Sequence, residues 1–154
     1  MSTGPYLSVA TFCEKVMQEA DGVLSMIRMI DRIYFESNEP EAAVDKIVVP
    51  VVLLVGFRAG EYRGSGHVEV RVTTPSGKVG VTPIEFDCEF RDEAPGTATA
   101  ININFQFSEV GTHWFTVRFE GAEVTRIPLE LRPRSEALLP STPSEVDATP
   151  SQQS

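Results

Sequence analysis

The sequence predicts an all-β fold: an antiparallel β-sandwich of the immunoglobulin-like kind, with about seven to eight strands. Three observations support this prediction. Residues 101–107 alternate large apolar side chains with amides, and residues 115–120 repeat the alternation with apolar and polar side chains. Turn signals recur about every 8–15 residues. Strands with one polar face need a second layer to cover the other face, which favours two packed sheets.

The N-terminal elements are predicted in turn from their local patterns. Tyr6–Cys13 alternates as a strand, and Glu14–Ala20 contains helix formers that predict a short helical turn ending at Asp21-Gly22. Val23–Phe35 fits the periodicity of a helix and of a strand equally well. The Asp-Gly break and the excess of later strands favour a strand, with Asp31 as the misfit on its face.

The later elements are predicted from apolar runs and turn signals. Val48–Arg58 is nearly continuous in apolar residues, as expected for a strand buried on both faces. Glycine supplies the positive φ of tight turns, so Glu120-Gly121 predicts a two-residue hairpin loop. The remaining predictions are strands at His67–Thr73 and within Lys78–Phe90, a turn at Pro75–Gly77, and a bulge near Thr125-Arg126.

The chain divides into three parts. We expect an N-terminal tail over residues 1–5, one sandwich domain over residues 6–132, and a disordered tail rich in Pro, Ser and Thr over residues 133–154. Within the domain, Glu36–Lys46 is an acidic connector.

The charge pattern excludes some partners. The formal net charge is −9 and Lys and Arg form no cluster, which argues against nucleic acid and membranes. The N-terminus lacks the pattern of a secretory signal, so we expect a cytoplasmic protein. Cys13 and Cys88 are then expected to be reduced, buried thiols, and whether they touch stays open.

Several short motifs occur together in an order that resembles an uncharacterised family of small bacterial proteins, a domain of unknown function. The motifs are Phe12-Cys13-Glu14, Asp21-Gly22, Ile30-Asp31-Arg32-Ile33, Pro75-Ser76-Gly77, Glu109-x-Gly111, Phe115-x-Val117, Gly121 and Ile127-Pro128-Leu129. The resemblance covers most of residues 7–131. It implies a compact sandwich with a strand at residues 23–35, and it provides no catalytic residues.

Candidate polar sites are few. Glu85, Asp87 and Glu89 form an acidic ladder on one strand face, which could attract a divalent cation. Their spacing of about 6–7 Å along a strand favours a solvated face instead. The two histidines, His67 and His113, lack zinc-site spacing. We therefore expect that the protein is not an enzyme and that it binds neither a cofactor nor a metal ion.

Two aromatic residues are candidate contacts. Trp114 points opposite to Phe115 and Val117, and Tyr62 lies in a glycine-rich loop. Trp114 either packs under a loop or offers a surface for stacking. The leading hypothesis is a non-catalytic module for protein interaction, or for self-association through an edge strand. The alternative is a carbohydrate or small-ligand binding module that uses Trp114 and Tyr62.

Overall fold

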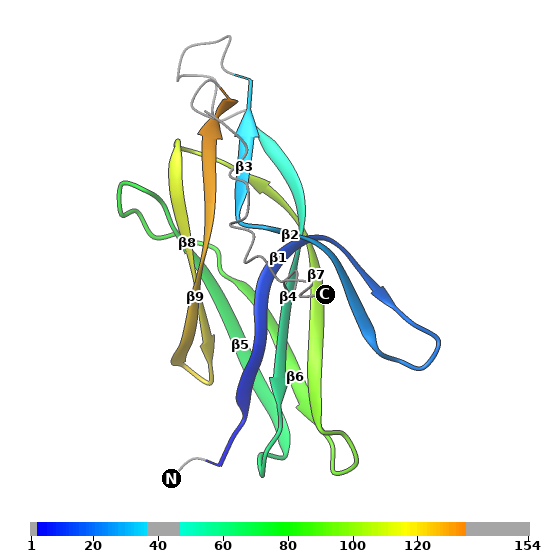
Figure 1. The fold of residues 1–154 in the computed structure, drawn as a ribbon. Coiled ribbons are helices and arrows are strands. Elements are labelled where there is room, and N and C mark those ends of the chain that lie inside the picture. The colour runs from blue at the N-terminus through cyan, green and yellow to red at the C-terminus, as the bar shows by residue number, and fades with distance from the viewer. Residues whose placement is uncertain (1–2, 37–46, 135–154) are drawn as a thin grey trace, which may run out of the picture.

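The computed structural model describes residues 3–36 and 47–134, which form nine strands in two stacked sheets (Figure 1). Sheet A has the order β2-β1-β4-β7, and sheet B has the order β3-β9-β8-β5-β6. The strands of sheet A are β1 (Tyr6–Gln18), β2 (Leu24–Ile30), β4 (Val48–Arg58) and β7 (Gly96–Gln106). Those of sheet B are β3 (Arg32–Phe35), β5 (Gly64–Thr73), β6 (Ile84–Phe90), β8 (Gly111–Phe119) and β9 (Ala122–Pro133).

The predicted all-β architecture of two sheets is confirmed, with nine strands rather than the expected seven to eight. One pair also differs from the predicted antiparallel arrangement, because β3 and β9 run parallel. The described residues contain no α-helix.

The core lies between the sheets and is built mainly from aromatic and β-branched side chains. Phe12 and Phe115 are almost completely buried and meet edge to face at 4.7 Å between ring centroids. Near the other end of the sandwich, Phe57 lies 5.2 Å from Phe119. Edge-to-face aromatic pairs add to the stabilisation that burial provides. The middle of β4 is buried on both faces, as its apolar run predicts.

The predicted helical turn over Glu14–Ala20 is wrong, because β1 continues as a strand to Gln18. The second half of β1 pairs with β2, for example Lys15 with Ile27 and Val16 with Met26. A segment of this length is too short to form a helix by itself. A neighbouring strand satisfies its backbone groups instead.

The ambiguous segment Val23–Phe35 is extended, which confirms the strand prediction. It contains two strands rather than one. Asp31, the misfit in the alternation, lies where the chain leaves sheet A and enters sheet B. Its carbonyl accepts a hydrogen bond from the Glu130 N–H at 3.0 Å, which begins the pairing of β3 with β9.

The predicted β8–β9 hairpin is confirmed. Glu120 and Gly121 connect the strands with φ values of 48° and 81°, the signs expected for a type I′ turn. The predicted bulge is present, but the register shift leaves Val124 as the extra residue, just before the expected position. The turn at Pro75–Gly77 is also confirmed, with the Gly77 N–H donating to the Thr74 carbonyl at 2.9 Å.

Two predictions fall outside the described residues: most of the acidic connector Glu36–Lys46 and the disordered tail from residue 135 onward.

Candidate interaction surface

The candidate interaction surface is the edge of sheet A that β7 forms. β7 pairs with β4 along its whole length, from Val48 opposite Gln106 to Arg58 opposite Gly96. Its other side has no neighbouring strand among the described residues. In Figure 1 β7 is the light-green strand that ends sheet A.

The hydrogen bonds between β4 and β7 determine which backbone groups of β7 point to the open edge. Just beyond the paired strands, the Phe107 N–H donates to the Ile47 carbonyl at 3.1 Å, and the Ala59 N–H donates to the Pro95 carbonyl at 2.9 Å. In an antiparallel ladder, hydrogen-bonded pairs recur at every second residue. The odd-numbered residues of β7 therefore bond to β4. The even-numbered residues direct their N–H and C=O groups to the open edge, and we call Ala98, Ala100, Asn102 and Asn104 the edge residues.

The edge residues also carry no charge. Their side chains are exposed on the outer face of sheet A. The sequence contains no Asp, Glu, Lys or Arg from Ala94 to Ser108, although the whole chain has a net charge of −9. Edge strands of soluble proteins are usually protected by charges, by prolines, by bulges or by being short. Within its paired length β7 has none of these.

The other edges in the described part of the chain are protected. β6 presents Glu85, Asp87 and Glu89 on its exposed positions. β3 is only four residues long and carries Arg32, which pairs with Glu130 at 3.1 Å. β2 is seven residues long and contains Arg28, a charged residue whose φ of 54° departs from the extended conformation. Among these edge strands β7 is the longest and the one without charged residues.

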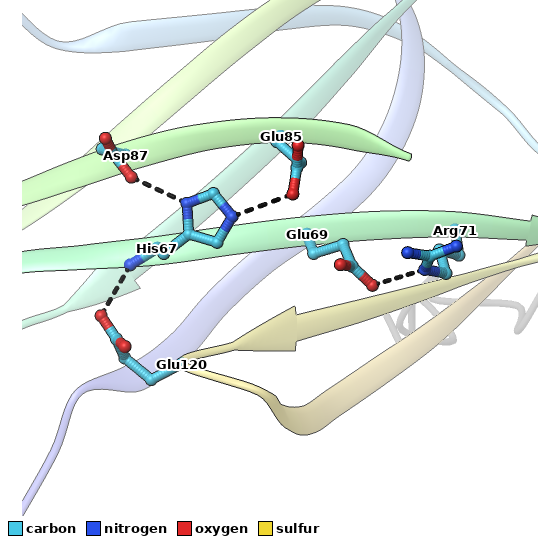
Figure 2. A network of polar contacts seen from close by, with 6 residues as sticks. All are labelled: His67, Glu69, Arg71, Glu85, Asp87 and Glu120. Atoms are coloured by element: carbon cyan, nitrogen blue, oxygen red, sulfur yellow. Dashed lines mark hydrogen bonds and ion pairs between the residues drawn. The ribbon is translucent and has the colours of Figure 1, made fainter. Parts of the chain in front are cut away.

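The acidic ladder of β6 is joined by His67 from β5 (Figure 2). The ring nitrogens lie 2.9 Å from Asp87 Oδ1 and 3.2 Å from Glu85 Oε1. The hydrogen bonds to Asp87 and then Glu85 raise the pKa of His67 above its usual value. Only the protonated imidazole can donate from both nitrogens, so this geometry suits His67 in its cationic form.

The rest of this network joins β5 to the β8–β9 loop through Glu120 and pairs two side chains along β5. The His67 N–H donates to the Glu120 carboxylate at 2.9 Å, and Arg71 Nε donates to Glu69 at 2.7 Å (Figure 2). The hydrogen bond from Arg71 lowers the pKa of Glu69. His67, Glu85 and Asp87 are exposed, whereas Glu69 and Arg71 are partly buried. The described residues contain no group of side chains suited to hold a metal ion. Exposed pairs of this kind contribute little stability.

His113 has the opposite environment. It is buried among aromatic rings, with Phe107 at 5.1 Å and Phe105 at 5.6 Å between ring centroids. Neither ring nitrogen has a hydrogen-bonding partner in the described structure. Burial lowers the pKa of His113, against a smaller opposing effect of the Gly111 backbone, so the ring is held neutral. A neutral, unpartnered ring in an apolar site acts as a core side chain.

The structure does not bring Trp114 and Tyr62 together. Trp114 is 43% exposed on the outer face of sheet B, in the direction that its position on the strand predicts. Tyr62 packs against the core, with its ring 5.2 Å from Phe90 and 5.4 Å from Phe119, and its hydroxyl donates to the Ser65 carbonyl. Because Trp114 and Phe119 are separated by about 16 Å along β8, the two aromatics do not form one site.

Cys13 and Cys88 are both buried and free, as predicted. Burial raises the pKa of both thiols, so neither is a reactive thiolate.

These features define a β-sandwich whose polar clusters are solvated surface pairs and whose distinctive surface is an uncharged edge strand. The chain belongs to DUF6941, a family of unknown function, whose model matches residues 8–132. This match confirms the resemblance to an uncharacterised domain family. No curated protein matches the sequence. No helix in residues 3–36 and 47–134 has the length and apolar character needed to cross a membrane.

The sequence did not identify the His67 cluster or the open side of β7. His67 lies two strand positions before Glu69 and so shares its outward face, which was a usable signal. Its position opposite Asp87 depends on the β5–β6 register, which the sequence does not determine. Likewise, which strand ends a sheet depends on topology.

Proposed function

We propose that this protein is a non-catalytic interaction module that self-associates, with the β7 edges of two copies pairing antiparallel about a two-fold axis. The observation that carries the proposal is the row of edge residues. Each directs an N–H and a C=O away from β4, and none brings a charge to the contact. Addition of a strand to an open edge is a common mode of protein recognition.

The lack of charge on β7 allows a second copy to bind at this edge. Two molecules with a net charge of −9 repel each other over most of their surfaces. Their β7 edges are places where they can approach without placing like charges opposite one another. A two-fold axis places the β7 edge of one copy against the β7 edge of the other, and two uncharged edges are compatible with each other. Two-fold symmetry is the commonest symmetry of soluble oligomers.

The pairing would join two four-stranded sheets into one continuous sheet, with both copies of sheet B on the same side. Because β6 borders β7 across the sandwich, the acidic ladders of the two copies would then lie on either side of the axis. Self-association should therefore strengthen as salt screens this repulsion.

Analytical ultracentrifugation over a range of concentrations tests the proposal on the full chain. Ala100→Pro removes one outward N–H and places a proline ring at the edge, while the ladder to β4 keeps its donors. Ala100→Ser is the matched control, because it keeps the N–H. We expect the wild type and Ala100→Ser to form dimers and Ala100→Pro to remain monomeric. Equal association of all three proteins would exclude the β7 edge as the interface.

The ligand-binding alternative has weaker support. A sugar site needs aromatic surfaces that converge on one ligand. Tyr62 packs against the core, so Trp114 would have to act without it.

Two finer assignments belong to the same proposal. We infer an immunoglobulin-like sandwich, because the orders β1-β4-β7 and β9-β8-β5-β6 match the A-B-E and G-F-C-C′ orders of such domains. A reducing, cytoplasmic location is supported by the two free buried thiols.

A further inference from the structure

The hairpin of β1 and β2 extends beyond sheet A as an arm, which we define as residues 14–29. β1 pairs with β4 only as far as Cys13 opposite Val52. At the next position that β4 would offer to β1, Pro50 has no N–H to donate. Beyond that point, within residues 3–36 and 47–134, the strands of the arm pair only with each other. A two-stranded hairpin alone is marginally stable in water, so an arm of this kind gains from a surface to cover.

The arm forms one side of a groove whose other side is the beginning of β7. The groove has a volume of about 680 Å³. Gln18, Gly22 and Leu24 from the arm face Gly96, Thr97 and Ala98 across it. In Figure 1 the blue arm crosses the sheet that contains β4 and β7 and reaches past the β7 edge. The groove is therefore continuous with the first half of the open edge.

The surfaces of this groove are almost uncharged. Gln18 and Leu24 pair with each other and line the groove. Val16 and Met26 form the next pair on the same face of the arm, and we call these four side chains the roof. The opposite wall contributes Gly96, Thr97 and Ala98. Among the lining residues that the structure describes, only Arg58 is charged. A strand without acidic or basic side chains matches such a groove.

The second half of β7 is a strand of that kind. In an antiparallel dimer, the second half of one β7 lies opposite the first half of the other. The segment that enters the groove is then the uncharged stretch from Asn102 onward of the second copy. By symmetry each copy holds the other.

We infer that the arm of each copy closes over the β7 strand of the other, with the roof packed on it, so that the dimer is held by two arms as well as by the paired edges. This inference rests on the proposed self-association through β7. It adds a second contact surface, which strand pairing alone does not require.

The test places charges on one face of the arm at a time. Leu24→Lys with Met26→Lys charges the roof. Met17→Lys with Ile27→Lys charges the opposite face and is the matched control, since all four side chains are apolar and lie on the same two strands. Ultracentrifugation gives the dimer dissociation constant of each full-length variant. The circular dichroism spectrum and the Trp114 fluorescence confirm that each variant is folded.

We expect the roof variant to raise the dissociation constant by about tenfold or more, because a charge is buried without a partner, and the control to change it little. Equal weakening by both variants would overturn the inference, since only the stability of the arm would then matter. An unchanged constant in the roof variant, with Ala100→Pro still monomeric, would overturn the arm contact but leave the β7 edge intact. A monomeric wild type would overturn both proposals.

Discussion

His113→Phe should make the protein more stable and remove one part of its pH dependence. The ring is 1% exposed, lies among Phe105 and Phe107, and has no partner for either nitrogen within the described structure. An unsatisfied buried polar group costs about 1–3 kcal/mol. Phenylalanine has a similar shape and no polar atom, so we expect a gain of that order at pH 7.

The pH dependence distinguishes the two histidines. The folded pKa of His113 is lowered, so its neutral form supports the fold above the unfolded pKa of about 6.5, and stability falls as the pH drops below that value. The slope is about 1.4 kcal/mol per pH unit until the folded protein also takes up the proton. The folded pKa of His67 is raised, so its contribution is complete below about 6.5 and is lost as the pH rises through the folded pKa.

Between about pH 5 and 6.5 the slope should therefore come from His113, because the carboxylates with shifted pKa values, Glu69, Glu109 and Glu123, have lowered values. Urea unfolding of the dilute protein at several pH values, followed by circular dichroism, measures this slope. His113→Phe should flatten the curve there, while His67→Gln should flatten it only above about 6.5. If His113→Phe keeps the wild-type slope between pH 5 and 6.5, the assignment of that slope to His113 is wrong.

Other consequences of the structure can be measured with single substitutions. Phe115→Ala should cost about 3–5 kcal/mol in urea unfolding, and Phe105→Ala should cost less because Phe105 is only partly buried; equal costs would contradict the burial assigned to them. Gly66→Ala should cost about 1–3 kcal/mol, because its Cβ would lie 2.1 Å from the Phe119 ring, whereas exposed Ser65→Ala should change stability little. Cys13 and Cys88 should react with a thiol reagent only after unfolding, and rapid labelling of the native protein would show that the thiols are accessible.

Much of the sandwich could be predicted because its strands alternate regularly. Each outward amide of β7 is followed by an inward Ile or Phe, so one face is fixed by the hydrophobic effect regardless of the neighbouring strands. The β8–β9 loop could be predicted as well, because Gly121 readily adopts positive φ.

The wrong predictions and the features that the sequence did not identify share a physical cause. Residues 14–18 contain helix formers, but their conformation is decided by pairing with β2, a contact that local propensity does not describe. The parallel pairing of β3 with β9 joins segments about a hundred residues apart in the chain. The open side of β7 and the meeting of His67 with Asp87 also depend on which strands become neighbours.

The exchange of individual amide hydrogens in β7, measured by NMR at low and high protein concentration, tests the central claim most directly. The N–H groups of Thr99, Ile101 and Ile103 bond to β4 and should be protected at both concentrations. Those of Ala98, Ala100, Asn102 and Asn104 face the open edge and should exchange quickly in the dilute protein. We predict that they become protected as the concentration rises. Fast exchange of these four amides at every concentration would contradict self-association through β7.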